Sequence, residues 1–203
     1  MRMAAVTCIL RPLFSDQYMS TAVTALCICR RTLFGFPEKP FNSRRKQYYE
    51  RRILGYSKEM LFDVVARVED YNQFLPACIR SEITFRGPDF VKAELEIGFP
   101  PMIVESYTSH VTLKKPTLVK ANCFDGRLFR HLATEWKFSD GLSNNSKSCT
   151  LEFKLDFEFR SELYSRLVNS VFDELVRQTV NAFLRRVEHL HGRPSHASLI
   201  ADK

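Results

Sequence analysis

The sequence predicts an α+β domain in which a curved antiparallel sheet of about six or seven strands wraps around one long C-terminal helix. Apolar and polar residues alternate with a period of two through much of residues 78–160, as in strands with one wet and one buried face. Turn-forming residues separate these stretches, and a long amphipathic stretch follows from Ser161. Only that stretch is long enough to cover the apolar face of such a sheet.

The elements before the sheet are short. Residues 48–56 mix apolar and charged side chains and are predicted to form the first strand. Ser57 is a natural N-cap, because its hydroxyl can accept a free amide of the first turn, and apolar residues follow it at helical spacing. A second short turn at residues 70–75 is expected to stop before Pro76, which cannot continue a helix.

The strands of the sheet are predicted near residues 79–86, 91–97, 102–114, 118–124, 128–139 and 151–159. Successive strands with short connections pair antiparallel. The helix is expected to run from residue 161 to about residue 190 and to end before Gly192 and Pro194. About 30 residues give a helix of roughly 45 Å, enough to cross a whole sheet. This arrangement is a helix grip, which can leave a space between the sheet and the helix.

The positive charge of the chain is concentrated at its N-terminus. Residues 1–46 carry eight basic and two acidic side chains, whereas residues 47–203 carry 22 and 21. A nucleic-acid-binding protein needs a basic face on the folded domain itself, so no nucleic-acid partner is expected. An Arg-rich, acid-poor leader with Ser and Thr is typical of a mitochondrial transit peptide. A secretory signal, with residues 21–29 as its apolar region, and a plain disordered tail remain the alternatives.

The cysteines indicate a compartment that keeps thiols reduced. Three lie in the leader, and Cys78, Cys123 and Cys149 are far apart in the predicted domain, with no His at metal-ligand spacing. We expect three parts: a transit peptide and disordered lead at 1–46, one domain at 47–191, and a polar C-terminal tail at 192–203. No metal and no catalytic cofactor are expected.

Several short motifs occur in order over about 140 residues. They are residues 50–57 (ERRILGYS), 95–101 (LEIGFPP), 105–109 (ESYTS), 125–129 (DGRLF), His131, Leu132 and Trp136, residues 157–161 (FEFRS) and residues 172–174 (FDE). Together they resemble the mitochondrial coenzyme Q-binding protein family, a branch of the START-like (polyketide cyclase/dehydrase) superfamily. The stretch at 141–147 is more polar than this resemblance leads us to expect.

The resemblance implies a START-like fold and binding of coenzyme Q (ubiquinone) in an apolar cavity. It further implies a lipid carrier or chaperone, peripheral on the matrix side of the inner mitochondrial membrane, that supports respiratory electron transport and ubiquinone biosynthesis. Quinone-synthesis enzymes or respiratory complexes are then possible partners. The residues expected to line the cavity are Leu95, Ile97, Tyr107, Trp136, Phe153, Leu155, Phe157, Val168, Phe172, Leu175 and Val176. By periodicity alone, each of them is ordinary core, and it is the resemblance that implies a lining role.

Two polar positions and one turn complete the candidate site. Strand periodicity places Glu105 and Arg130 on inward faces, so they could pair near a quinone head group, although edge positions that reach solvent explain them too. Phe99, Pro100, Pro101 and Met102 form a stiff apolar turn where polar residues are usual. Such a turn could contact the membrane or gate the cavity, or it could fold onto the core.

The sequence does not favour an enzyme. It lacks a nucleophile elbow, a zinc-protease motif, a phosphate-binding loop and a Cys–His pair. A cyclase or dehydrase needs an acid–base pair inside the cavity, and only Glu105 with Tyr107 or Arg130 qualifies. A scaffold for quinone-synthesis enzymes, without a tightly bound ligand, is the other alternative.

Overall fold

The computed structural model describes residues 45–99, 103–123, 125, 129–161 and 172–200 of the chain. The elements run in the order β1 (Arg45–Leu54), α3 (Lys58–Ala66), η1 (Val68–Asp70), α4 (Tyr71–Phe74), β2 (Cys78–Arg86), β3 (Phe90–Phe99), β4 (Ile103–Lys114), β5 (Leu118–Cys123), β6 (Phe129–Asp140), β7 (Cys149–Phe159), α6 (Phe172–His191) and β8 (Leu199–Ile200).

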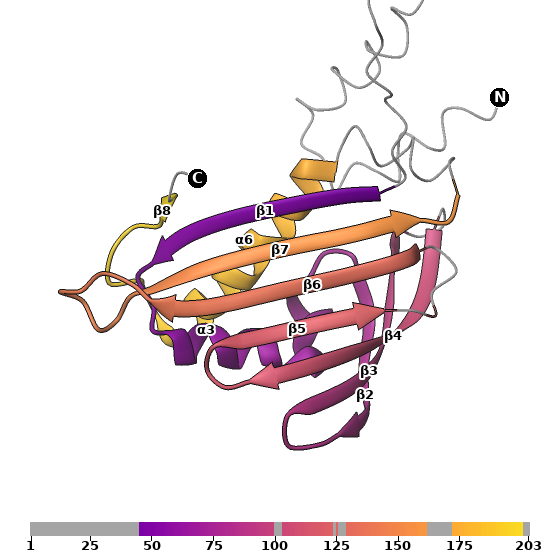
Figure 1. The fold of residues 1–203 in the computed structure, drawn as a ribbon, viewed down its shortest axis with the longest axis horizontal. Helices are drawn as coiled ribbons and strands as arrows, with labels where there is room; N and C mark the ends of the chain where they lie inside the picture. Colours follow the sequence, from indigo (N-terminus) through magenta and orange to yellow (C-terminus); the bar gives the residue numbers. More distant parts are fainter. Residues whose placement is uncertain (1–44, 100–102, 124, 126–128, 162–171, 201–203) are drawn as a thin grey trace, which may run out of the picture. The chain divides into compact units, whose positions relative to one another are not determined.

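The strands form one sheet in the order β2-β3-β4-β5-β6-β7-β1-β8, and each neighbouring pair is antiparallel (Figure 1). Strands β2 to β7 follow one another along the chain, as the short predicted turns require. Strand β1, the first in the chain, pairs with β7 over its whole length, with Arg45 opposite Glu158 and Leu54 opposite Cys149. The predicted α+β class with an antiparallel sheet is therefore confirmed.

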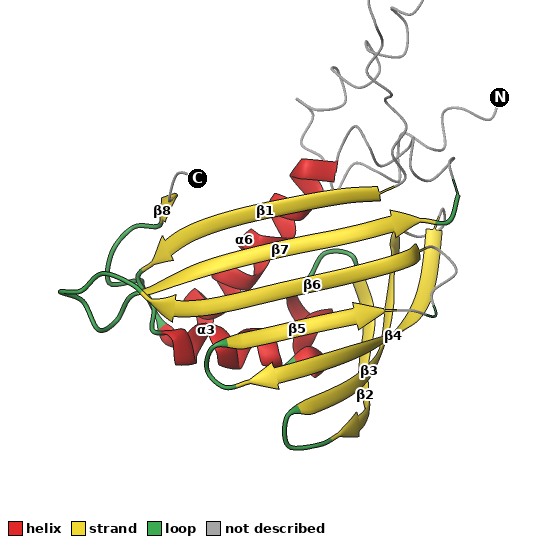
Figure 2. Ribbon diagram, in the orientation of Figure 1, coloured by secondary structure: helices red, strands yellow, loops and turns green. Residues whose placement is uncertain are grey.

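The helices lie on one side of the sheet, and α6 runs obliquely behind the strands (Figure 2). The buried side chains of α6 include Val176, Val180, Phe183 and Val187, at helical spacing along one face. Burying a side chain of this size gains about 1.5–3 kcal/mol, so packing against the sheet is the main stabilisation of this helix. Residues 162–171 of the predicted helix lie outside the described residues.

Helix α3 begins where its cap predicts. The Ser57 hydroxyl accepts a hydrogen bond from the Met60 amide, and the helix buries Leu61 and Val65 one turn apart. The second short helix, α4, ends at Phe74, two residues before Pro76. Later in the chain, α6 ends at His191, and Gly192 adopts a φ of 80°, a conformation that glycine accepts without steric cost.

The C-terminal segment, residues 192–200, has more structure than its composition predicts. Strand β8 pairs with β1, with Arg52 opposite Ile200 and Ile53 opposite Leu199, and so adds an eighth strand to the sheet. The Tyr56 hydroxyl donates to the carbonyl oxygen of Gly192 at 3.0 Å. These contacts hold the segment against the end of β1. The first strand was predicted to continue to residue 56, but β1 ends at Leu54.

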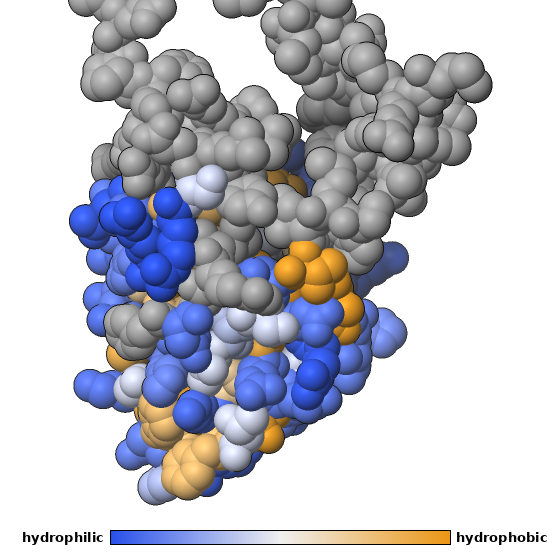
Figure 3. Space-filling view, turned by 90° about the vertical axis from the view of Figure 1, so that its right-hand side faces the viewer, coloured by the Kyte–Doolittle hydropathy of each residue, from blue (hydrophilic) through white to orange (hydrophobic). Residues whose placement is uncertain are grey.

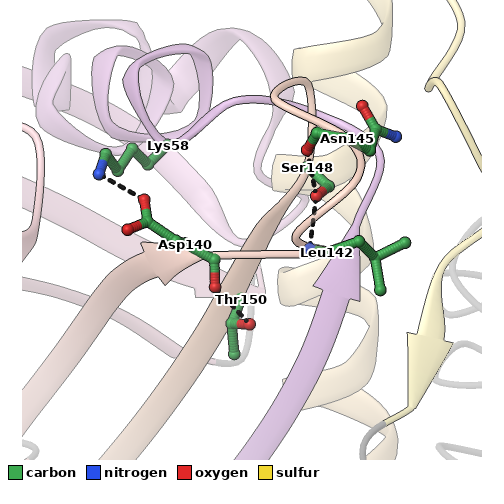
Figure 4. A network of polar contacts seen from close by, with 6 residues as sticks. All are labelled: Lys58, Asp140, Leu142, Asn145, Ser148 and Thr150. Atoms are coloured by element: carbon green, nitrogen blue, oxygen red, sulfur yellow. Dashed lines mark hydrogen bonds and ion pairs between the residues drawn. The ribbon is translucent and has the colours of Figure 1, made fainter.

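The polar stretch at 141–147 lies in the hairpin between β6 and β7 (Figure 4). The Ser148 hydroxyl accepts from the Leu142 amide and donates to the Asn145 carbonyl oxygen, both at 2.7 Å. At the ends of the two strands, Thr150 of β7 donates to the carbonyl oxygen of Asp140 of β6, and Lys58 of α3 pairs with the Asp140 carboxylate. The polar residues of this loop therefore satisfy its backbone groups.

Candidate functional site

The candidate site is the interior between the sheet and α6. Aromatic rings gather where β6 begins and β7 ends. The centroid of the Phe157 ring lies 5.1 Å from the ring centroid of Phe172 on α6 and 5.9 Å from that of Phe129 on β6. Phe159 lies 4.9 Å from Phe157, and Tyr107 on β4 meets Phe129 edge-on. The structure thus brings the predicted lining residues Tyr107, Phe157 and Phe172 into one cluster.

A second aromatic group lies midway along the sheet, around Trp136. Its ring lies 4.3 Å from Phe153 on β7 and 4.7 Å from Phe183 on α6, and it is buried. Phe183 in turn meets Tyr71 and Phe74 of the short helix α4 at 5.2 Å. These rings form a continuous apolar layer between sheet and helix. Trp136 and Phe153, both predicted as lining, lie at its centre.

The register of β3 and β4 places four further predicted residues in pairs. Leu95 lies opposite Tyr107, and Ile97 lies opposite Glu105. Leu95 is buried, whereas Ile97, Tyr107 and Glu105 are half-buried, so all four share the inward face. Burial raises the pKa of the Tyr107 hydroxyl above its ordinary value, so this group stays protonated and can donate a hydrogen bond.

Arg130 does not lie where strand periodicity places it. Its side chain is 53% exposed and pairs with Glu158 at 3.6 Å, on the outer face of the sheet. The physical reason is a β-bulge between Phe129 and His131, where the register against β7 shifts by one residue. Beyond the bulge it is Phe129 that faces inward and is buried, so the predicted inward position of Arg130 is wrong.

The remaining predicted residues fall into two groups. Leu155, Leu175 and Val176 are half-buried or buried, and Leu155 and Val176 belong to or pack against the core cluster. Phe99 closes β3, while Pro100, Pro101, Met102 and Val168 lie outside the described residues. The gate or membrane role of the turn at 99–102 therefore stays a prediction.

Three inward-facing polar residues on β1 were not assigned a role from the sequence. The Tyr48 hydroxyl donates to the Glu50 carboxylate at 3.0 Å, and Arg52 pairs with the other oxygen of that carboxylate. The Arg52 guanidinium also donates to the Asn181 side-chain oxygen of α6 at 3.3 Å. Buried Leu54 lies on the same strand face, and a period of two then places residues 52, 50 and 48 inward. Applied to residues 48–54, that periodicity would have found them.

A cleft of about 250 Å³ opens between the end of β1, the C-terminal half of α6 and the C-terminal segment. Leu54, Tyr56, Leu184 and Pro194 give it apolar walls, and Asn181 is among its polar lining residues. The cleft therefore adjoins the polar residues of β1 through Asn181, which contacts Arg52.

Within the described ranges, no cluster of His, Cys, Asp and Glu side chains is arranged to hold a metal ion. No helix in the part of the chain that the structure describes combines the length and the apolar character needed to cross a bilayer. The described apolar surface in Figure 3 consists of separate patches among hydrophilic residues. Ile79 and Phe85 on the edge strand β2 and Val104 on β4 are among the exposed apolar side chains.

Comparison with known proteins identifies the family. Residues 54–184 match the family described as polyketide cyclase / dehydrase and lipid transport. The chain belongs to this family. Among curated relatives, it is 43% identical to the mitochondrial coenzyme Q-binding protein COQ10 of Drosophila melanogaster. The alignment of 155 residues covers 76% of this chain and 64% of the relative. The COQ10 homolog B of Xenopus laevis is 42% identical, over 80% of this chain and 66% of the relative. The chain thus spans just under two thirds of the length of these two relatives.

The chain is also similar to proteins with other names. The ribosome association toxin RatA of Escherichia coli is 31% identical over 68% of this chain and 85% of its own length. Among solved structures, the Zhui aromatase/cyclase from Streptomyces sp. R1128 aligns with a TM-score of 0.61 at 15% identity, over 71% of this chain and 94% of its own. A START superfamily protein from Mycobacterium smegmatis aligns with a TM-score of 0.59 at 18% identity, over 71% of this chain and 98% of its own. These two likenesses show the START-like fold, as predicted.

Proposed function

We propose that the domain binds coenzyme Q between its sheet and α6 and acts as a lipid carrier or chaperone rather than as an enzyme. The observation that carries this proposal is the buried apolar core between sheet and helix, which contains both aromatic groups, the one around Phe157 and the one around Trp136. The names of the relatives support it, because those from Drosophila and Xenopus are called coenzyme Q-binding proteins.

An isoprenoid tail needs such a layer. At about 0.8 kcal/mol per buried carbon, each five-carbon unit gains up to roughly 4 kcal/mol on leaving water. A tail of several units therefore cannot remain free in solvent at a useful concentration, and a carrier must offer it an apolar interior with few polar groups. On the inner faces of β3 and β4, Leu95 and Ile97 are apolar, and Tyr107 supplies a hydroxyl donor.

The cellular part of the proposal rests on the relatives and on the leader. The relatives from Drosophila and Xenopus are named mitochondrial, and the Arg-rich residues 1–46 are typical of a transit peptide. We place the protein at the matrix side of the inner membrane as a peripheral protein, supporting respiratory electron transport and ubiquinone synthesis. Contact with the membrane through residues 99–102 predicts that Phe99→Asp with Met102→Asp weakens binding to liposomes while the fold is retained.

The decisive experiment is to purify the full chain, extract it with organic solvent and identify quinones by mass spectrometry. Bound ubiquinone is expected. Leu155→Trp, which fills the interior from β7, should lose the ligand. Lys154→Trp places the same ring one residue away on the exposed face and should retain it, because the half-buried Leu155 and the exposed Lys154 point to opposite sides of the strand.

An empty protein that also takes up no quinone from loaded liposomes would refute the carrier and favour a scaffold for quinone-synthesis enzymes. Turnover of a quinone precursor by the purified protein would instead favour a cyclase-type enzyme. Glu105 and Tyr107 are the inward-facing groups predicted for that chemistry. Circular dichroism would verify that the Leu155→Trp and Lys154→Trp variants are folded.

A further inference from the structure

The polar residues at the seam between β1 and α6 form one connected network, which we name the seam network: Tyr48, Glu50, Arg52 and Asn181. Tyr48 and Arg52 both donate to the Glu50 carboxylate, and Arg52 donates to Asn181 across the seam. The side chains of Glu50 and Arg52 are only 12% and 14% exposed. Burial and the hydrogen bond to Glu50 raise the pKa of Tyr48 to about 12, so its hydroxyl remains a donor at neutral pH.

Fold stability alone does not account for an ion pair at this position. Removing two charges from water costs several kcal/mol per ion, and apolar residues of similar volume often stabilise a fold equally well or better. The residues around the pair show that an apolar alternative is available, because the adjacent Tyr48 ring packs 6.2 Å from Phe153 of the core. A polar ligand would give the seam network a role that apolar side chains cannot fill.

The seam network touches two different environments. On one side, Tyr48 contacts Phe153, whose ring lies 4.3 Å from Trp136 in the apolar interior. On the other side, Asn181 lines the cleft of about 250 Å³. A molecule with an apolar tail and a polar head can therefore lie with its head at the seam network and its tail in the interior. The cleft has room for a substituted ring but not for a long tail, since pockets for drug-sized ligands begin at about 300 Å³.

The donors of the seam network suit uncharged carbonyl oxygens. The guanidinium of Arg52 has five N–H donors and no acceptor, and its bonds to Glu50 and Asn181 occupy only part of that capacity. Its contact with Asn181 is 3.3 Å long, beyond the usual 2.7–3.2 Å, so a ligand oxygen can replace it at little cost. The Asn181 amide then becomes a second donor, because its NH₂ group can face the same oxygen.

We propose that Arg52 and Asn181 recognise the carbonyl oxygens of a quinone ring, with Glu50 and Tyr48 holding the guanidinium in place. This assignment rests on the proposed function, since it places the head group of the same ligand. It replaces the head-group role predicted for Arg130, whose side chain faces outward.

The test compares two probes on the full chain: a ubiquinone with a short isoprenoid tail, and the polyprenol with the same tail and no quinone ring. The wild-type chain is expected to prefer the quinone. Arg52→Met should lower quinone affinity at least tenfold, because it removes one charge-assisted hydrogen bond. The ratio of the affinities for the two probes should then fall close to one. Arg51→Met is the matched control, because Arg51 lies next in sequence on the exposed face of β1 and should keep the wild-type ratio.

Arg52→Met leaves the Glu50 carboxylate without its charged partner and with the Tyr48 hydroxyl as donor, so two further variants guard against unfolding. Glu50→Gln with Arg52→Met removes both charges together, a change that buried pairs often tolerate. Asn181→Leu removes the polar partner on α6 and keeps its size. Each is expected to lose the preference for the quinone.

The outcomes separate this proposal from the proposed function. Folded variants of Arg52 and Asn181 that retain the wild-type preference would overturn the head-group site. A wild-type chain that binds both probes equally well would also overturn it, while quinone binding itself would stand. A wild-type chain that binds neither probe would overturn the proposed function, and the head-group site with it.

Discussion

The backbone amide of Ser195 donates a 2.8 Å hydrogen bond to the carbonyl oxygen of Gly55. The Ser195 hydroxyl donates to the Lys147 carbonyl oxygen and accepts from the Asn145 amide, each at 2.9 Å. Three segments far apart in the sequence therefore meet at one serine: the end of β1, the β6–β7 hairpin and the C-terminal segment. Gly55 lines the cleft beside the seam network, as do Pro194 and His196 on either side of Ser195.

Gly55→Ala is expected to displace the C-terminal segment. A Cβ at this position would lie 2.6 Å from the backbone nitrogen and oxygen of His196 and 2.8 Å from the Ser195 nitrogen, and backbone atoms cannot rotate away. We expect a loss of about 1–3 kcal/mol in the free energy of unfolding, typical of overpacking. Limited proteolysis should also cut the variant sooner after Gly192, because the pairing of β8 with β1 is lost.

The control for this variant is Gly87→Ala. The nearest atoms to a Cβ there are 3.5 Å away, an ordinary van der Waals contact. This substitution should leave both the urea midpoint and the proteolysis pattern as in the wild type. Equal effects of the two substitutions would mean that loss of a glycine, rather than the clash with the C-terminal segment, is responsible.

Ser148→Ala is expected to destabilise the β6–β7 hairpin. The buried Ser148 hydroxyl bridges the Leu142 amide and the Asn145 carbonyl oxygen, and the alanine leaves both without this partner (Figure 4). An unsatisfied buried group costs about 1–3 kcal/mol, which urea denaturation can measure. Ser146→Ala, at an exposed position of the same loop, should change stability by less than about 0.5 kcal/mol.

The sheet and its covering helix are predictable from the sequence because their signals are periodic. The alternation of Leu151, Phe153, Phe157 and Phe159 matches four buried residues of β7, and the helical spacing of Val176, Val180 and Val187 matches the buried face of α6. The Ser57 cap also needs only local information, since its partner Met60 is three residues away. In each case the pattern and the contact lie within a few residues of one another.

The failures have non-local causes. A bulge between Phe129 and His131 reverses which side Arg130 faces, and strand periodicity alone cannot reveal an inserted residue. Strand β8 is two residues long, and its pairing with β1 depends on Gly55 and on the hairpin, neither of which is near it in the sequence. The polar stretch at 141–147 carries no periodic signal, and its residue Asn145 contacts Ser195, which lies 50 residues further along the chain.

Acid should weaken the contact between β1 and β7 through Asp156. The Arg45 guanidinium donates to this carboxylate at 2.9 Å, and this bond, helped by Gln47, lowers the pKa of Asp156 to about 2 from its ordinary 3.8. A depressed carboxylate pKa stabilises the folded state above the unfolded value, so the contribution is full above about pH 4 and is lost as the pH falls towards 2.

Asp156→Asn should therefore unfold more easily than the wild type at pH 6, by up to about 1 kcal/mol for a pair this close to solvent. The difference between the two proteins should shrink as the pH falls from about 4 to about 2. Urea denaturation at several pH values measures it. A difference that stays constant over that range would show that Asp156 does not act through its charge.

The thiol of Cys149 should resist modification in the native protein. It is fully buried, and burial raises its pKa to about 12. Since the thiolate is the reactive form, very little of this cysteine is reactive at pH 8. The pKa of Cys78 is raised less, to about 11, and its side chain is slightly more accessible. Peptide mass spectrometry after alkylation should show Cys78 labelled before Cys149, and both labelled rapidly in denaturant. The reverse order would mean that β7 opens more readily than β2.

Trp136 is the only tryptophan among the 203 residues, so its fluorescence reports on one place in the interior. The indole is buried between Phe153 and Phe183, in the apolar layer in which we place the isoprenoid tail. The seam network, where we place the quinone ring, reaches the same Phe153 through Tyr48. Short-tailed ubiquinone should quench its emission in a saturable way, because a quinone accepts an electron from an excited indole at close range. The polyprenol with the same tail should not quench, and Trp136→Phe should abolish the signal. Quenching that rises linearly with quinone concentration and never saturates would indicate collisions in solution, and the ligand would then have to lie away from Trp136.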